Sequence, residues 1–83
     1  LLPHMRRLRS SELLGHRRFV RGLALSLTGE PESAEDLAQE ALLIGLQHPP
    51  DDQGATRAWL GQVVRRLAWR RFRSERARDE REQ

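Results

Sequence analysis

Two interruptions in an otherwise helix-compatible sequence limit the folds that are open to this chain. Gly29 is suited to the position just after the last turn of a helix, and the short turn Glu30–Ser33 follows it. Farther along, the run His48–Ala55 contains two adjacent prolines and a glycine, which exclude a helix there. Three helical segments joined by short links remain. This division predicts an all-α fold, a compact three- to four-helix bundle.

The first segment has apolar residues at helical spacing. Ser10 or Ser11 is a suitable N-cap, so we expect a helix from there to about Thr28, with Gly29 ending it. The predicted core-facing residues are Leu13, Phe19, Val20, Leu23, Ala24 and Leu27. His16 lies on the same side and is interpreted as a core or boundary histidine. The segment is therefore an amphipathic helix that has to pack against a partner.

The second segment carries capping residues at its start. Ser33 is the predicted N-cap, and Asp36 is the carboxylate three positions later that would complete a capping box. The helix is expected to extend from Ala34 to Gln47. Its predicted core side holds the larger residues Leu37, Ala41 and Ile44 beside the small residues Ala34, Ala38 and Gly45. The small residues would allow a neighbouring helix to approach closely.

The opposite side of this second helix is polar around one leucine. The polar residues are Asp36, Gln39, Glu40 and Gln47, and they surround Leu43. An exposed leucine framed by carboxylates and amides has the character of the anchor and rim of a protein interface. We therefore expect this face to dock on a protein.

The third segment is predicted to be a helix from near Thr56 to about Arg78. Its apolar stripe consists of Trp59, Leu60, Val63, Val64 and Leu67. Gln62, Arg65, Arg66, Arg73 and Arg76 lie together on the other side, with Trp69 in their midst. Guanidinium groups pair with phosphates, and an exposed indole offers a base a flat surface for stacking. This face therefore predicts binding to a nucleic-acid strand.

Composition excludes several classes of protein. The net charge is only +3, but all 15 basic residues are arginine and lie towards the two ends, whereas acids concentrate between Glu30 and Asp52. The chain has no cysteine, which agrees with a reducing cytoplasm, where we expect the protein to act. The longest apolar run, Ala41–Leu46, is far shorter than the ~20 residues of a membrane helix. No nucleophile motif, phosphate loop or metal-ligand spacing occurs, so we expect neither an enzyme, nor a cofactor, nor a metal.

The expected domain occupies residues 10–78. Residues 1–9 read as a cloning scar or a short N-terminal turn, since Leu1-Leu2-Pro3-His4 precedes Met5. Residues 79–83 read as the start of a charged linker. The chain is therefore interpreted as a fragment of a longer protein.

Several of these residues form motifs of a known family. The string Ala34–Leu42, Ala-Glu-Asp-Leu-Ala-Gln-Glu-Ala-Leu, is followed after a loop by Arg57–Leu60, Arg-Ala-Trp-Leu, and then by Val64–Ala68. Together with Phe19–Ala24 and the turn after Thr28, they resemble region 2 of bacterial RNA polymerase sigma factors. The similarity is greatest to the extracytoplasmic-function (ECF) group, and it covers nearly all of residues 11–78.

The resemblance assigns a role to each distinctive face. It implies that Asp36, Gln39, Glu40 and Leu43 dock on the clamp helices of the polymerase β′ subunit, an arginine-bearing coiled coil. It also implies that the third helix binds the non-template strand of the promoter -10 element and holds it melted. The DNA-binding residues are then Gln62, Arg65, Arg66, Arg70 and Arg73, with Trp69 as the stacking surface. An anti-sigma protein is a further expected partner, and membrane insertion is not expected.

Other parts of the third helix and its preceding loop follow the family less closely. The flipped-base pocket of the family maps to His48–Ala55, where a double proline is not typical. Arg66 stands where the family often has asparagine, so a group suited to phosphate or guanine replaces an amide suited to base edges. Trp59 belongs to the Ala-Trp-Leu signature, and its place at the edge of the apolar stripe favours a core role.

Two alternative functions keep one of the two faces and drop the other. A sigma-mimicking domain would bind an anti-sigma factor without promoter recognition, and the acidic face fits that function equally well. An arginine-rich RNA-binding helix would account for the third segment but not for the Asp36, Gln39 and Glu40 face. Binding to a membrane surface is disfavoured, because the arginine face carries one aromatic residue and the apolar face is needed for the core.

Overall fold

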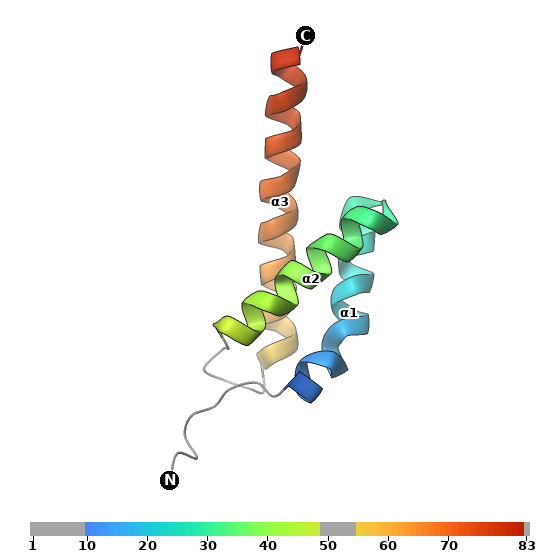
Figure 1. Cartoon of the computed structure of the whole chain (residues 1–83), viewed down its shortest axis with the longest axis vertical. Helices are drawn as coiled ribbons and strands as arrows, with labels where there is room; N and C mark the ends of the chain where they lie inside the picture. The colour runs from blue at the N-terminus through green and yellow to red at the C-terminus, as the bar shows by residue number, and fades with distance from the viewer. Residues whose placement is uncertain (1–9, 49–54, 83) are drawn as a thin grey trace.

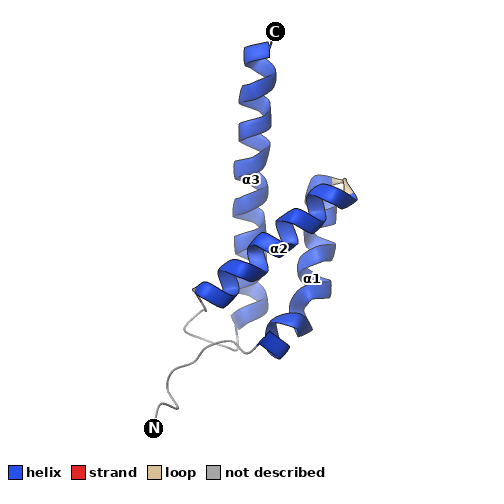
Figure 2. Ribbon diagram, viewed as in Figure 1, coloured by secondary structure: helices blue, strands red, loops and turns tan. Residues whose placement is uncertain are grey.

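The computed structural model of the chain describes residues 10–48 and 55–82, which form three α-helices. They are α1 (Ser10–Thr28), α2 (Pro31–Gln47) and α3 (Thr56–Glu82). No strand occurs in these two ranges, and Figure 2 shows helix as their regular structure. The predicted all-α class is confirmed. The expected N-terminal turn, the Leu13 side chain and the loop residues 49–54 lie outside what is described.

The first two helices form a hairpin, and the third helix packs against both. Figure 1 shows α2 crossing α1 after a tight turn, with the N-terminal half of α3 passing behind α2 and its C-terminal half projecting beyond the hairpin. The principal extents of the molecule are 59 × 20 × 16 Å, because α3 is much longer than the hairpin. The helix ends at Glu82, four residues later than the expected end near Arg78. A long stretch of α3 is therefore presented without cover.

The turn between α1 and α2 depends on one glycine in the left-handed region. Gly29 has a φ of 72°, and its N–H donates to the Leu25 carbonyl at 2.8 Å. The Thr28 hydroxyl donates to the Ala24 carbonyl at 2.9 Å and so closes the last turn of α1. A side chain at residue 29 would be strained in this conformation, which is why the predicted glycine stop is confirmed.

The prediction that Ser33 caps α2 is wrong. Glu30 is the N-cap, with extended backbone angles, and Pro31 is the first helical residue. The Ala34 N–H donates to the Glu30 carbonyl at 2.9 Å, which closes the first turn. Proline fits this place because its φ is already helical and its missing N–H would have no partner there. Asp36 consequently lies in the second turn and is not a capping residue.

The core is built from small and branched residues of all three helices. Its buried members are Val20, Ala24, Ala34, Leu37, Ala38, Ala41, Leu60, Val64 and Leu67. Phe19, Leu23, Trp59 and Val63 are half-buried against this cluster, so the edge position predicted for Trp59 is confirmed. His16 is also half-buried, as expected of a boundary residue. The buried alanines of α2 allow α1 and α3 to approach closely, as the sequence predicted.

Leu27 was expected in the core but is 46% exposed. It lies in the last turn of α1, and Figure 1 shows α3 well apart from the α1–α2 turn at this level. The helical periodicity gives the direction of Leu27 correctly. It carries no information on where the neighbouring helix diverges.

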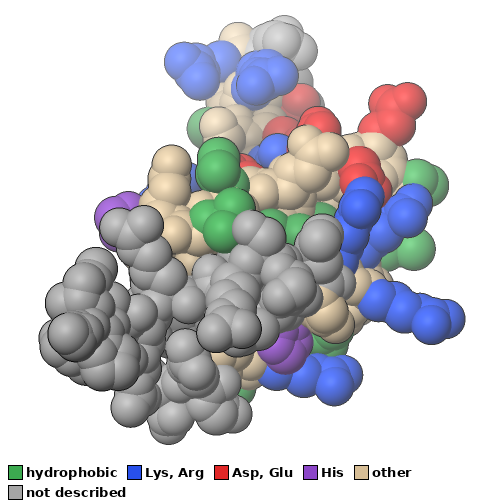
Figure 3. Space-filling view, turned by 60° about the horizontal axis from the view of Figure 1, so that its bottom comes forward, with side chains coloured by type: hydrophobic (Ala, Val, Ile, Leu, Met, Phe, Trp, Pro, Cys, Tyr) green, Lys and Arg blue, Asp and Glu red, His purple; other side chains and the backbone are tan. Residues whose placement is uncertain are grey.

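Polar contacts join the helices around this core. Glu35 of α2 pairs with Arg17 at 3.5 Å and with Arg21 at 3.2 Å, both on α1. The Arg57 guanidinium lies 4.3 Å from the centre of the Phe19 ring and so links α3 to α1. Figure 3 shows basic and acidic side chains adjacent on one flank of the molecule. The Glu35 pairs thus add polar contacts between α1 and α2 to those of the apolar core.

Candidate nucleic-acid and protein interfaces

The outer face of α3 carries an exposed tryptophan among arginines. Trp69 is 61% exposed, and it lines a shallow hollow with Arg66, Arg70, Arg73 and Ser74. These residues recur every three or four positions, so they follow one side of the helix. The buried residues Leu60, Val64 and Leu67 lie on the other side of the same helix. Four of the six predicted DNA-binding residues are thus brought together.

Gln62 and Arg65, the other two, line a different hollow. It lies between α3 and α1, and its other walls are Phe19, Ala55, Arg57, Ala58 and Gly61. The Arg65 guanidinium folds back towards Gly61, since its Nη1 would be 3.6 Å from a Cβ built there. The predicted DNA-binding set is therefore divided: Gln62 and Arg65 belong to the groove beside α1, whereas the remaining four belong to the exposed outer face of α3.

Arg71 differs from the arginines beside it. Its Nη1 donates to the Ser33 carbonyl of α2 at 3.1 Å, and the side chain is half-buried. This contact ties α3 to the first turn of α2. Arg71 is therefore a structural residue, and it is not one of the predicted DNA-binding residues.

Phe72 is an exposed aromatic residue to which the sequence analysis assigned no role. It is 55% exposed, and its ring centre lies 6.3 Å from that of Trp69, with the two planes tilted by 31°. The spacing of three residues on one helix was the available signal, because such residues are surface neighbours. On a helical wheel Phe72 lies just outside the arc of the arginine face, so the wheel alone does not group it with Trp69.

The outer face of α2 is polar around one exposed leucine, as predicted. Leu43 is 53% exposed, and Asp36, Gln39, Glu40 and Gln47 are exposed around it. Within residues 10–48 and 55–82, neither Asp36 nor Glu40 forms an ion pair, whereas neighbouring Glu35 holds two arginines. The two carboxylates are thus available to a cationic partner.

The two faces point away from each other. Each lies opposite the buried stripe of its own helix, around Leu37 and Ala41 in α2 and around Leu60 and Val64 in α3. Because these stripes meet in one core, the outer faces are on opposite sides of the molecule. The two faces therefore do not overlap.

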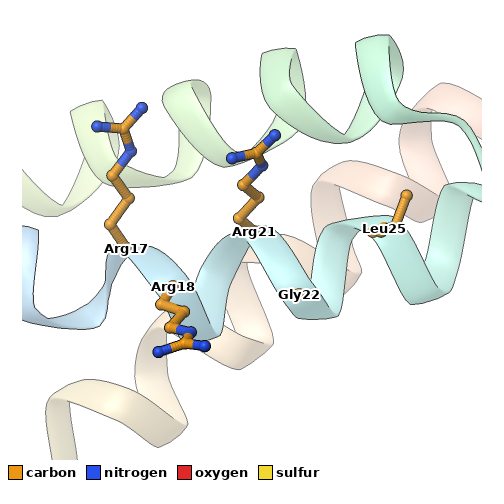
Figure 4. A pocket seen from close by; sticks show the side chains of 5 residues that line it. All are labelled: Arg17, Arg18, Arg21, Gly22 and Leu25. Atoms are coloured by element: carbon orange, nitrogen blue, oxygen red, sulfur yellow. The ribbon is translucent and has the colours of Figure 1, made fainter.

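A third hollow lies on α1 and is explained by the fold. Its walls are Arg17, Arg18, Arg21, Gly22 and Leu25. Figure 4 shows Arg17 and Arg21 projecting towards α2, where they pair with Glu35, and Arg18 projecting to the other side. Two of its three guanidinium groups are therefore engaged in holding α1 to α2.

The described side chains contain no group of three or more His, Asp or Glu residues placed to hold a metal ion. Over the same part of the chain, no helix is long and apolar enough to cross a membrane.

Comparison with known proteins identifies the family. Residues 14–78 match the family model of Sigma-70 region 2. The ECF RNA polymerase sigma factor SigL of Mycobacterium tuberculosis, found in three strains, is 44% identical over 59 residues, which is 68% of this chain and 33% of SigL. No solved structure matches the chain significantly. The chain belongs to the Sigma-70 region 2 family and is a region 2 domain of the ECF group. It spans about a third of the length of the curated relatives that it matches.

Proposed function

We propose that residues 10–78 form the domain with which a sigma factor docks on the RNA polymerase core and holds the promoter -10 element melted during transcription initiation. One observation carries the proposal: two exposed faces of different chemistry lie on opposite sides of one small core. The face of α2 offers carboxylates around Leu43, and the face of α3 offers arginines around Trp69. The protein would act in the cytoplasm with the polymerase.

The α2 face would bind the clamp helices of the β′ subunit. Asp36 and Glu40 are exposed and, in the described part of the chain, have no ion-pair partner that would have to be displaced. Carboxylates of this kind form short charge-assisted hydrogen bonds with guanidinium groups. Leu43 would supply the apolar anchor at the centre, with Gln39 at the rim. Such an interface gains orientation from its charges and affinity from its buried leucine.

The α3 face would bind the non-template strand. Arg66, Arg70 and Arg73 can contact phosphates, while Trp69 offers an exposed ring to a base. Gln62 and Arg65 would contact the strand where it passes the groove beside α1. No covalent chemistry is needed, because a protein that binds single strand better than duplex shifts the melting equilibrium. Stacking worth ~1–3 kcal/mol per base can offset the lost base pairing.

Two single substitutions test whether the faces act separately. Glu40→Arg should weaken binding to an isolated β′ clamp-helix fragment at least ~100-fold, since a like charge would face the arginines of that coiled coil. Binding to a single-stranded -10 oligonucleotide should remain. Trp69→Ala should do the reverse: clamp binding stays, and oligonucleotide affinity falls by ~1–3 kcal/mol, or roughly 5- to 150-fold.

Both partners' affinities should be measured on folded protein, checked by circular dichroism. Glu75→Arg repeats the charge change on the exposed surface of α3, and it should leave clamp binding as it is. If Glu40→Arg still binds the clamp fragment, the docking face is wrongly assigned. If Trp69→Ala binds DNA as the parent does, Trp69 is an ordinary surface residue.

A sigma-mimicking domain that binds an anti-sigma factor is the second candidate. The α2 face serves it equally well, whereas the arginine and aromatic surface of α3 has no part in it. Failure of the parent chain to bind any single-stranded DNA, together with tight binding to an anti-sigma protein, would favour this alternative. In the first proposal an anti-sigma factor is a further partner, which would compete for the same α2 face.

A further inference from the structure

Phe72 is the one large exposed aromatic ring on α3 that the proposed function leaves without a role. Its ring lies 6.3 Å from Trp69, so the two rings form one apolar surface with both members more than half exposed. Two exposed aromatic rings side by side leave a large apolar area in contact with water, which is unfavourable unless a partner covers it. The two rings flank Arg71, whose guanidinium reaches the Ser33 carbonyl of α2, but the rings themselves lie on an exposed surface of α3. Neither α1 nor α2 covers it.

The two rings stand at the junction of two hollows. The hollow already described is lined by Arg66, Trp69, Arg70, Arg73 and Ser74. Another hollow, not described above, lies farther along α3, and its walls are Trp69, Phe72, Arg73, Arg76, Ala77 and Glu80. Because Trp69 and Arg73 belong to both, the two hollows adjoin, and together their lining residues run from Arg66 to Glu80. This track is ~21 Å long at 1.5 Å per residue, several times the ~3.4 Å spacing of nucleotides along a strand.

We propose that Trp69 and Phe72 together form a two-ring stacking platform for single-stranded nucleic acid, so that a strand bound at Trp69 continues along the projecting end of α3 to Arg76. This inference rests on the proposed function of the same helix. It adds a second stacking residue, a further phosphate contact and a direction for the strand. The path leads away from the α1–α2 hairpin and along the uncovered part of α3.

The charges around the rings identify the partner as nucleic acid. Four arginines line the two hollows, at residues 66, 70, 73 and 76, and one carboxylate, Glu80, lies at the far end. Arginine and aromatic residues also occur together at protein interfaces, but an excess of four guanidinium groups over one carboxylate calls for a partner with repeated negative charge, which the phosphates of a nucleic-acid strand supply. Stacking on such rings is tolerant of sequence, since every base has a π-face. The platform would therefore add affinity for a single strand without reading its sequence.

Glu80 limits the strength of binding at the end of the track. Its Oε1 lies 3.8 Å from Nε of Arg76, and both side chains are more than 70% exposed. A phosphate that approaches Arg76 meets the negative charge of Glu80 and must replace it as the partner. Glu80→Gln should consequently tighten strand binding, whereas a change that removes the Arg76 charge should weaken it.

The test is fluorescence anisotropy of a labelled, mixed-sequence single strand of 12 nucleotides with the full chain, over a range of salt concentrations. Phe72→Ala should weaken binding about five- to tenfold, near the low end of one stacking interaction, with an unchanged salt slope. Phe72→Leu should weaken it similarly, and Phe72→Trp should restore it. Arg76→Gln should lower the salt slope by about 0.7, the loss of one phosphate contact.

Two matched variants serve as controls. Leu46→Ala removes another exposed apolar side chain, on α2, and should bind the strand as the parent does. Arg78→Gln removes an arginine of the same helix that lies ~200° round from Arg76 and should leave the salt slope almost unchanged. All variants change exposed residues, and circular dichroism verifies that they fold.

Each outcome of the test separates the inference from the function beneath it. If the parent binds the strand and both Phe72→Ala and Phe72→Leu bind equally well, the platform is refuted and the proposed function stands. If Phe72→Ala weakens duplex binding as much as single-strand binding, the platform is again refuted, because a paired base cannot stack on it. If the parent binds no single strand, the DNA-binding part of the proposed function fails together with the platform.

Discussion

Adjacent arginines of α3 have different tasks, although their side chains are chemically identical. Arg70 and Arg73 are exposed beside Trp69, whereas Arg71 donates to the Ser33 carbonyl of α2. One residue turns the helix by ~100°, which is enough to move a guanidinium from the outer face to the neighbouring helix. Mutations of single arginines in this run should therefore separate stability from binding.

Arg71→Ala should lower the free energy of unfolding by about 1–2 kcal/mol, because a half-buried hydrogen bond from a charged donor is lost and the Ser33 carbonyl loses its partner. Urea titration followed by circular dichroism measures this loss. Arg73→Ala, two residues away and exposed, is the matched control and should unfold at the same urea concentration as the parent. Equal stability of Arg71→Ala and the parent would show that the contact with Ser33 is not maintained in solution.

The sequence predicted the exposed residues of the candidate sites well, but not their grouping. The exposure of Trp69, Arg66 and the α2 acids follows from helical periodicity, which fixes the direction of each side chain from its own axis. Two features depend on the neighbouring helices and on where they stop covering α3. One is that Arg65 folds back beside α1, and the other is that Phe72 lies next to Trp69 on an exposed surface. A single helical wheel contains neither kind of information.

At the scale of the element, α2 combines a packing face and the proposed docking face within one turn. Glu35 is held by Arg17 and Arg21 of α1, while Asp36, the next residue, faces outwards. The small buried residues of the same helix let both neighbours approach. The packing of α2 thus fixes where its exposed polar face lies relative to the core.

Glu35→Gln should lower the free energy of unfolding by about 0.5–1 kcal/mol at low salt, because two partly exposed ion pairs between α1 and α2 are lost. The difference should disappear near 1 M salt, where the Debye length falls to ~3 Å. Urea midpoints at both salt concentrations give the comparison. Glu80→Gln, which breaks a pair within α3, should show no such salt-dependent loss, and an equal loss in the two variants would contradict a role of Glu35 in joining the helices.

The starts and ends of the helices show which local signals the sequence makes clear. The end of α1 was predicted correctly, because the left-handed conformation that ends a helix strains most residues other than glycine. The start of α2 was predicted three residues too late, because the sequence of Ser33 and Asp36 also satisfies the capping-box pattern. Pro31 decides the matter, because its fixed φ favours the first helical position over a turn.

At the scale of the whole molecule, the shape follows from the unequal lengths of the helices. A short hairpin and the first half of α3 make the core, and the second half of α3 projects from it (Figure 1). More than half of the 15 arginines lie between Arg65 and Arg81, so the positive charge is concentrated on the projecting helix. The negative face of α2 points the other way. This separation of charge is what the proposed function requires, with one face for the polymerase and one for the DNA strand.

The most direct test of this account is fluorescence anisotropy of labelled single-stranded oligonucleotides that carry candidate non-template -10 sequences. Duplexes of the same sequences and scrambled single strands are measured in parallel, over several salt concentrations. The account predicts that particular single strands bind better than both controls, with log affinity falling against log salt at about 0.7 per phosphate contact. Equal affinity for all single strands would reduce α3 to a non-specific basic helix. Absence of single-strand binding would contradict the account.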